Sequence, residues 1–257
     1  MNQLSDRAVI SLVGPEARHF LQGLITNDIG TVAPGRPTYA ALLTPQGKIL
    51  FDFLLFESDD VLLIDCPRTM RVALVKLLSH YKLRAKVEIA ERDDLAVFVG
   101  DGPADPRLAA LGRRNVGALV ATETADVAYR NRRLDLGVPE GEDFGSDKIF
   151  ALDGGLDELH AISFRKGCYV GQELTARMKH RGTDRKRLLA VDAADGTPLP
   201  AGAAVSAAGR DLGTLTSTYG ARGFALIRLD RLAETGKAPC HAGAIPVRVA
   251  KPMWLFA

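Results

Sequence analysis

The chain has 257 residues, of which 47% are hydrophobic and 25% charged, and its formal net charge is only +2. This composition excludes wholesale disorder, and the balanced charge gives no overall signal for nucleic acid. No apolar run approaches the roughly 18 residues that a membrane span needs, and the first residues lack the apolar stretch of a secretory signal. The three cysteines form no Cys-x-x-Cys pair, which is typical of a reducing compartment. We therefore expect a cytoplasmic protein with no membrane partner.

The first hundred residues alternate predicted strands with two predicted amphipathic helices. Gly14-Pro15 and Pro67 each precede an apolar stripe at helical spacing, as expected where proline occupies the first turn of a helix. Pro45-Gln46-Gly47 predicts the turn of a hairpin. Strands joined as hairpins favour an α+β layer over a parallel doubly wound sheet. The composition of residues 101–106 predicts a surface loop. The strands expected here are residues 9–13, 39–43, 49–56, 61–65, 86–90 and 95–99.

From about Lys186 the pattern changes to short strands between Gly- and Pro-rich turns. That spacing predicts a small antiparallel barrel. The strands expected there are residues 187–192, 204–207, 212–219, 224–228 and 245–249. The sequence thus predicts two units, an α+β region of residues 1–186 and a C-terminal β-barrel of residues 187–257.

One stretch carries the strongest chemical signal. We call Lys166-Gly167-Cys168-Tyr169-Val170-Gly171-Gln172-Glu173 the signature segment; it places a thiol between glycines, beside cationic side chains and just before a helix expected near Gln172. Thiolate is the reactive form of cysteine, and neighbouring cations or a helix N-terminus favour it. A free cysteine is otherwise a small buried hydrophobe. The context favours an exposed, activated Cys168, whereas Cys66, in an apolar strand, and Cys240 keep the structural interpretation.

The signature segment and further motifs resemble the YgfZ family, relatives of the glycine-cleavage T protein, which is the tetrahydrofolate-dependent aminomethyltransferase. The resemblance implies a folate-binding, T-protein-like α+β region with two ferredoxin-like sub-domains and a C-terminal antiparallel β-barrel around a central opening. It also implies a role in assembly or repair of iron–sulfur clusters in client enzymes, including radical enzymes of tRNA modification. The further motifs are Gly14-Pro15-Glu16-Ala17-Arg18-His19-Phe20-Leu21-Gln22-Gly23, Thr26-Asn27-Asp28, Leu43-Thr44-Pro45-Gln46-Gly47-Lys48, Tyr81-Lys82-Leu83-Arg84-Ala85-Lys86-Val87 and Arg133-Leu134-Asp135-Leu136-Gly137-Val138-Pro139-Glu140.

Within the signature segment, Cys168 and Lys166 are the candidate catalytic residues. Lys166 either keeps the Cys168 thiolate charged or pairs with the glutamate tail of a folate, unless it is a solvated surface lysine. Tyr169 either offers its ring to a pterin or packs in the core. Gly167 and Gly171 are expected to permit close backbone approach or a positive φ.

Four polar residues elsewhere complete the candidate folate site. Asp52 lies in an otherwise apolar strand, where a carboxylate either faces outward or needs a partner. The resemblance aligns it with the second of two aspartates in the folate site of the T-protein relatives, and Phe51 replaces the first. By the same resemblance, Asp135 matches a glutamate that hydrogen-bonds the pterin ring. Asn27, in a polar turn, and Arg177, in the basic helix, are the remaining candidates.

The segment of residues 165–187 is basic, with eight Lys or Arg side chains against two acidic ones. Such a patch attracts a polyglutamylated folate, an acidic client protein or RNA, or it is simply a solvated face. The five histidines show no ligand spacing, so we expect no bound metal ion. One cysteine cannot hold a cluster that usually needs four thiolates, which leaves transient contact, sharing across a dimer, or redox exchange.

We therefore expect a tetrahydrofolate-binding accessory protein whose partners are folate, iron–sulfur client enzymes and cluster carrier proteins, with Cys168 as its essential group. The alternative is a folate-dependent one-carbon transferase of the aminomethyltransferase type, against which Phe51 counts. A third hypothesis, an RNA-binding module, ranks last because only Tyr169 supplies an aromatic platform in the basic segment.

Overall fold

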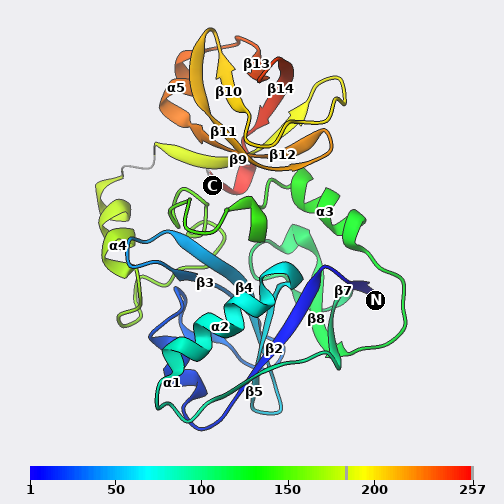
Figure 1. The fold of residues 1–257 in the computed structure, drawn as a ribbon, viewed down its shortest axis with the longest axis vertical. Helices are drawn as coiled ribbons and strands as arrows, with labels where there is room; N and C mark the ends of the chain where they lie inside the picture. The colour runs from blue at the N-terminus through cyan, green and yellow to red at the C-terminus, as the bar shows by residue number, and fades with distance from the viewer. Residues whose placement is uncertain (183–184, 256–257) are drawn as a thin grey trace.

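The computed structural model of the protein describes residues 1–182 and 185–255. An α+β body with two sheets lies below a six-stranded barrel (Figure 1). The predicted α+β class and C-terminal barrel are thus confirmed. Within the described part of the chain, no helix has the length and apolar character needed to cross a membrane.

The larger sheet is antiparallel and is covered on both faces. Helices α1 (Ala17–Gln22) and α2 (Arg71–Lys82) pack on one face, toward which Phe53 points, and the neighbouring Leu54 meets the core shared with the second sheet. Most residues of β2, β3, β4 and β5 are buried whichever face they point to, which explains the nearly continuous apolar runs of these strands. In the order β3-β4-β5-β2-β6, the strands are β3 (Thr38–Leu43), β4 (Ile49–Ser58), β5 (Val61–Pro67), β2 (Arg7–Val13) and β6 (Glu88–Glu91).

The second sheet has the order β1-β7-β8 and is followed by helix α3 (Asp126–Asp135). Residues 101–106 are not the predicted loop, because β7 extends to Ala104. Asp101 and Ala104 are exposed as expected, but Asp105 is buried in an ion pair with Arg107. Gly100 and Gly102, at φ +97° and +91°, allow the irregular register that the loop-like composition concealed. The strands are β1 (Asn2–Leu4), β7 (Leu95–Ala104) and β8 (Arg113–Ala118).

Six antiparallel strands close the C-terminal barrel around its own apolar core. Leu188 and Phe224 belong instead to the core of the body, so the barrel packs directly on it. Strand β13 and helix α5 (Leu229–Glu234) escaped prediction, because three and six residues are too short for a recognisable period. In closed order, the strands are β10 (Ala204–Ala207), β11 (Arg210–Tyr219), β12 (Arg222–Arg228), β9 (Lys186–Ala193), β14 (Ile245–Ala250) and β13 (Cys240–Ala242).

Helix α4 (Gln172–Arg181) begins at the predicted residue and ends before Gly182, whose left-handed conformation is a common helix stop. Helix α2 begins one turn after Pro67, because a short 3-10 turn intervenes. The 3-10 helices are η1 (Ile29–Thr31), η2 (Arg68–Met70), η3 (Ala109–Leu111), η4 (Gly141–Asp143) and η5 (Met253–Leu255).

Candidate functional site

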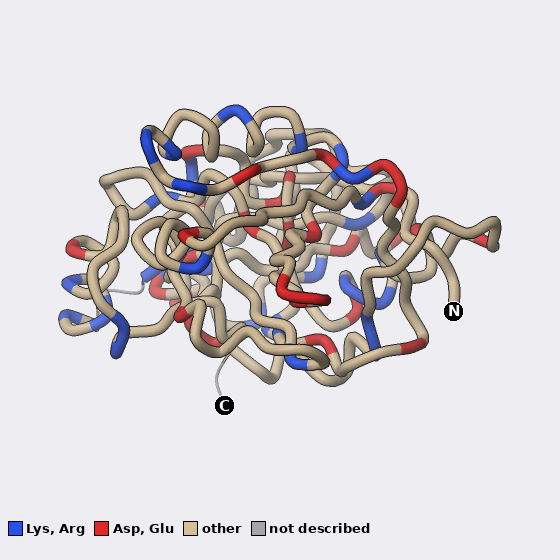
Figure 2. The backbone as a smooth tube through the Cα atoms, turned by 90° about the horizontal axis from the view of Figure 1, so that it is seen from below, with Lys and Arg blue, Asp and Glu red and all other residues tan. Residues whose placement is uncertain are grey.

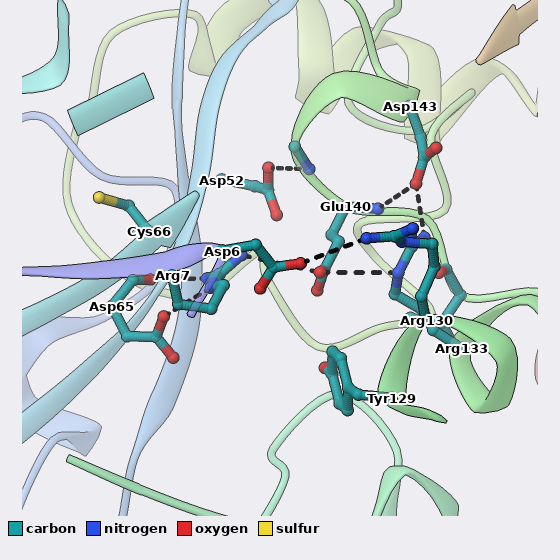
Figure 3. A network of polar contacts seen from close by, with 12 residues as sticks. Asp6, Arg7, Asp52, Asp65, Cys66, Tyr129, Arg130, Arg133, Glu140 and Asp143 are labelled. Carbon is teal, nitrogen blue, oxygen red and sulfur yellow. Dashed lines mark hydrogen bonds and ion pairs between the residues drawn. The ribbon is translucent and has the colours of Figure 1, made fainter. Parts of the chain in front are cut away.

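Buried arginines, each paired with a carboxylate, gather where the two sheets and α3 meet. Figure 3 shows two of them, Arg7 and Arg133. Asp65 on β5 holds two of them: Oδ1 accepts from Arg7 Nε at 2.7 Å and Oδ2 accepts from Arg114 Nε at 2.6 Å. Burial alone would raise the pKa of Asp65, but the two guanidinium groups outweigh it and hold the pKa below its usual range. The four arginines are Arg7, Arg107, Arg114 and Arg133.

Glu140 lies among three of these arginines. Its Oε2 accepts a hydrogen bond from Arg107 Nη1 at 2.6 Å, whereas its Oε1 stands 3.7 Å from Arg7 Nη1 and 3.6 Å from Arg133 Nε. Burial would raise the pKa of Glu140, yet the surrounding guanidinium groups hold it well below its usual range. Glu140 is therefore a buried, ionised acceptor.

A cavity of about 220 Å³ opens beside Glu140. We call it the junction cavity, because strands of the body, helix α3 and the barrel all contribute to its wall. Tyr129 of α3 and Tyr219 of β11 bring aromatic rings to it. Its wall includes Arg7, Tyr129, Arg133, Glu140, Gly141 and Tyr219. A polar pocket with two aromatic residues is suited to a small heterocycle.

Asp52 is buried behind this cavity rather than facing outward. Its Oδ2 accepts from the Tyr39 hydroxyl at 3.0 Å, and its Oδ1 accepts from the backbone N–H of Gly141 at 2.7 Å. Burial raises the pKa of Asp52, and the charge of Glu140 adds to the effect. Gly141 lines the cavity, so Asp52 fixes the position of its wall.

Lys166 is buried, and it does not extend toward solvent. Its Nζ donates to the carbonyl oxygens of Gln22 at 2.6 Å, Ile25 at 2.7 Å and Asn27 at 2.8 Å. An ammonium group has three N–H donors, so all of them are used. Lys166 thus ties the signature segment to the turn after α1, and it has no donor left for a thiolate or a folate carboxylate.

The Lys166 tie predicts a distinctive pH dependence. Burial lowers the pKa of Lys166 to about 8, from its ordinary value of 10.5. Between these values the unfolded chain binds the proton that the folded chain releases, so this group makes the free energy of unfolding rise with pH. We expect the rise in the wild type and its absence in Lys166→Met, measured by urea unfolding from pH 7 to 10.5. Lys76→Met, which removes an exposed lysine of α2, controls for the lost charge; identical wild-type and Lys166→Met slopes would refute the assignment.

Cys168 is exposed, in the irregular stretch that precedes α4. Tyr169 next to it is buried in the core, with its ring 5.2 Å from Lys166 Nζ, and burial raises the pKa of its hydroxyl to about 12. Gly171 has φ +85°, and a Cβ there would lie 2.5 Å from the carbonyl oxygen of Thr44. The expectation of positive φ and close approach is confirmed for Gly171. At Gly167 it is wrong, because a Cβ would meet open space.

Asn27 connects the signature segment to Asp52. Its backbone oxygen accepts from Lys166, and its Nδ2 donates to the carbonyls of Tyr39 at 2.8 Å and His160 at 2.7 Å. Tyr39 in turn donates its hydroxyl to Asp52. Four predicted site residues, Asn27, Asp52, Lys166 and Tyr169, therefore belong to one linked set of contacts.

Asp135 and Arg177 lie apart from this set. Asp135 is the last residue of α3, its side chain is 67% exposed, and its Oδ1 pairs with Arg222 of the barrel at 2.8 Å. Arg177 is exposed on α4. Lys and Arg positions gather on the side of the molecule where α4 lies (Figure 2).

Sequence reasoning missed the residues at the centre of the network, namely Arg7, Asp65 and Glu140. Glu140 is the last residue of a motif that resembles the YgfZ family, but the sequence predicts no role for it. Asp65 lies on a strand with apolar neighbours, so the rule that singled out Asp52, a charge within an apolar strand, would have found it. Arg7 follows Asp6 and precedes the predicted strand of residues 9–13, so the same rule does not mark it.

Three relatives place the chain among known proteins. Residues 185–257 match the family model of the CAF17 C-terminal beta-barrel domain. The chain is 33% identical to the iron–sulfur cluster assembly factor IBA57 of Mus musculus, over 93% of the chain and 79% of the relative. The Homo sapiens protein of that name is 32% identical over 94% of the chain and 80% of the relative. An IBA57 homologue of Neurospora crassa is 33% identical over 74% of the chain, which spans about half of that longer relative, 52%.

The fold is similar to that of the glycine cleavage system aminomethyltransferase T of Bartonella henselae. The TM-score is 0.73, with 98% of this chain and 85% of that chain covered, at 14% identity. This similarity defines the class, a T-protein-like α+β body with a C-terminal barrel. The identity to the mouse and human relatives defines the family more narrowly: the chain belongs to the IBA57/YgfZ family, and the resemblance to the YgfZ family is confirmed.

Proposed function

We propose that the chain is a tetrahydrofolate-binding accessory protein for assembly or repair of iron–sulfur clusters in client enzymes. The observation that carries the proposal is the exposed thiol of Cys168 on an anchored segment, tied by Lys166 on one side and packed through Gly171 on the other. The mouse and human relatives are named as iron–sulfur cluster assembly factors, which supports it. A rigid, exposed thiol suits brief contact with a cluster held by another protein.

The cluster is cargo in this proposal, because one thiolate is too few to hold it. Among the residues that the structure describes, no group of three or more His, Cys, Asp or Glu side chains is placed to bind a metal ion. Cys66 is buried, and burial raises the pKa of its thiol to about 12. The remaining cluster ligands would therefore come from a carrier protein or from the client enzyme.

The folate would bind at the junction cavity. Charged side chains and the residues Tyr129 and Tyr219 line it, and a pterin ring supplies hydrogen-bonding groups and an aromatic face for such a wall. Asp52 would act through Gly141, and Asn27 and Tyr169 would position the signature segment. Asp135 and Arg177, at the surface, would meet only the outer part of a folate or a partner protein.

Complementation tests the central assignment. In a strain that lacks this protein, Cys168→Ala is expected to restore no more cluster-enzyme activity than an empty vector, with the activity of a radical tRNA-modifying enzyme as the readout. Cys240→Ala, which removes a partly exposed thiol from the barrel, is the matched control and should restore wild-type activity. Full restoration by Cys168→Ala, at equal protein level, would show that the thiol is not the essential group.

The likeness to an aminomethyltransferase favours a second candidate, a folate-dependent one-carbon transferase. Phe51 on β4, where the T-protein relatives carry an acid by the resemblance, counts against it. Formation of methylenetetrahydrofolate from tetrahydrofolate and an aminomethyl donor would decide for this candidate.

The two structural units, the cellular location and the partners complete the proposal. We propose residues 1–186 and 187–257 as the two units of the chain. We also propose the cytoplasm as its location, because none of its three cysteines is in a disulfide, although the mouse and human relatives are named as mitochondrial. Cluster carriers, client enzymes and folate are its proposed partners, with no direct role for nucleic acid.

A further inference from the structure

We infer that the turn after α2 is a docking site for a partner protein, with Leu83 entering an apolar pocket of that protein and the cationic side chains beside it facing carboxylates on the rim. We call residues 82–86 the docking turn. It belongs to the motif of residues 81–87, to which the proposed function assigns no role. Helix α2 runs away from the barrel, so the docking turn lies on a part of the body remote from the barrel (Figure 1).

Leu83 has a backbone conformation that normally belongs to glycine. Its φ is +46° and its ψ is −107°, close to the first central position of a type II′ turn. The N–H of Ala85 donates to the carbonyl oxygen of Lys82 at 2.8 Å, which closes that turn. A bulky side chain is rare at positive φ, because its Cβ crowds the backbone. Such strain points to a function for the side chain that occupies the position.

The side chain of Leu83 extends into solvent from a turn that is held in place. Leu83 is 87% exposed, so packing within the chain does not account for a leucine here. Tyr81 and Val87, on either side, pack in the apolar core beneath α1 and α2, and the backbone N–H of Lys86 donates to Glu16 Oε2 at 2.6 Å. A turn that is already fixed loses little conformational freedom on binding, which suits an anchor for a partner's pocket.

Three cations surround this leucine. Lys82, Arg84 and Lys86 are partly or fully exposed, and within the part of the chain that the structure describes their side chains form no hydrogen bond or ion pair. Residues 79–87 contain no acidic residue that could neutralise them. The surface around Leu83 is therefore positive, and the complementary surface is an acidic one.

A protein surface fits this turn better than a membrane or a nucleic acid does. A bilayer would gain only one leucine, because the other exposed positions of residues 79–86 are polar or charged. A nucleic acid would pair with the cations, but single strands are held mainly by stacking on aromatic rings, which the exposed positions lack. An apolar anchor inside a charged rim is the ordinary anatomy of a protein–protein interface.

Photo-crosslinking in living cells tests the inference on the full chain. The photoreactive residue p-benzoylphenylalanine replaces Ser79, which is exposed one helical turn before the leucine, or Val72, which is 67% exposed at the start of α2, as the control. We expect one protein to crosslink through position 79 and not through position 72, at a site bordered by Asp or Glu residues. Arg84→Glu should reduce this adduct at least about tenfold, whereas Lys237→Glu, which reverses an exposed charge in the barrel, should leave it unchanged.

Leu83→Gly separates docking from folding, because glycine is the residue that this backbone conformation favours. Loss of the buried leucine contact should reduce the position-79 adduct at least about tenfold. The urea midpoint of unfolding should be no lower than that of the wild type, because the strain at positive φ is relieved. A leucine with only a structural role would give the opposite result, a lower midpoint with the adduct retained.

Three other results would overturn the inference. They are the absence of an adduct specific to position 79, an adduct equally strong in Leu83→Gly, and an adduct that nuclease removes. Sedimentation with vesicles of phosphatidylglycerol and phosphatidylethanolamine tests for a membrane; wild type that sediments while Leu83→Gly stays in solution would assign the turn to a bilayer and overturn it as well. None of these readouts measures folate binding or cluster-enzyme activity, so the proposed function is tested separately.

Discussion

Replacing Asp65 by asparagine is expected to lower the free energy of unfolding by about 3–5 kcal/mol, the range for removing one partner of a buried ion pair. The side chain of Asp65 is fully buried, and it holds Arg7 at 2.7 Å and Arg114 at 2.6 Å. Asparagine keeps the volume but leaves two guanidinium groups in the interior without their counter-charge. Urea unfolding followed by circular dichroism, with the denaturant slope compared between variants, gives the difference.

The control for Asp65→Asn is an ion pair of the same chemistry at the surface. Asp94 pairs with Arg92 at 2.6 Å, with 63% of its side chain exposed, so Asp94→Asn should lower the free energy of unfolding far less than Asp65→Asn does. Since the pKa of Asp65 is lowered on folding, the stability from its pairs is present above its unfolded value of 3.8 and is lost as the pH falls below it. Equal, small effects of the two substitutions would show that the buried pairs are not a main source of stability.

Gly171→Ala is the second substitution with a large expected effect. The left-handed φ of +85° costs roughly 1–2 kcal/mol for a residue with a Cβ, and here that Cβ would also lie 2.5 Å from Thr44 O and 2.9 Å from Leu43 Cβ. The backbone of the β3–β4 hairpin or of the signature segment must shift. We expect lower stability and, although Cys168 is retained, loss of cluster-enzyme activity in complementation.

Gly167→Ala is the matched control, four residues away in the same segment. Nothing lies within 4 Å of a Cβ at Gly167, and it is not among the positive-φ residues. The free energy of unfolding of Gly167→Ala should stay within about 0.5 kcal/mol of the wild-type value. In complementation, this variant should restore as much cluster-enzyme activity as the wild type. Equal loss of activity in both variants would mean that the segment needs bare glycine for a partner's approach, and that its packing on the hairpin is not what positions Cys168.

Local patterns in the sequence were sufficient for most elements of the fold. The hairpin of β3 and β4, the barrel strands and the start of α4 were predicted because each depends on neighbours in the chain: turn residues, alternation or helical spacing. The exceptions were β1, β8, α3, β13, α5 and the extension of β7. Strands β1 and β13 and helix α5 are short, β7 is made irregular by Gly100 and Gly102, and β8 and α3 are mostly polar, so no apolar period marks them.

The candidate site was predicted less completely. Cys168 stood out by its context, and Asp52 by its place in an apolar strand. Lys166 was expected to serve a thiolate or a folate, but three backbone carbonyls take its donors. No local sequence pattern could predict that Lys166 lies next to the turn after α1, because about 140 residues separate the two in the chain.

The sequence by itself determined the α+β class, the terminal barrel and the signature segment with its family resemblance, because these depend on periodicity and on contiguous motifs. Only the tertiary structure decided which carboxylate faces the junction cavity, that Asp135 pairs with the barrel instead, and that Lys166 is a structural tie. The physical reason is that hydrogen bonding and charge pairing in the interior depend on contacts between distant segments, which packing alone brings within reach of one another.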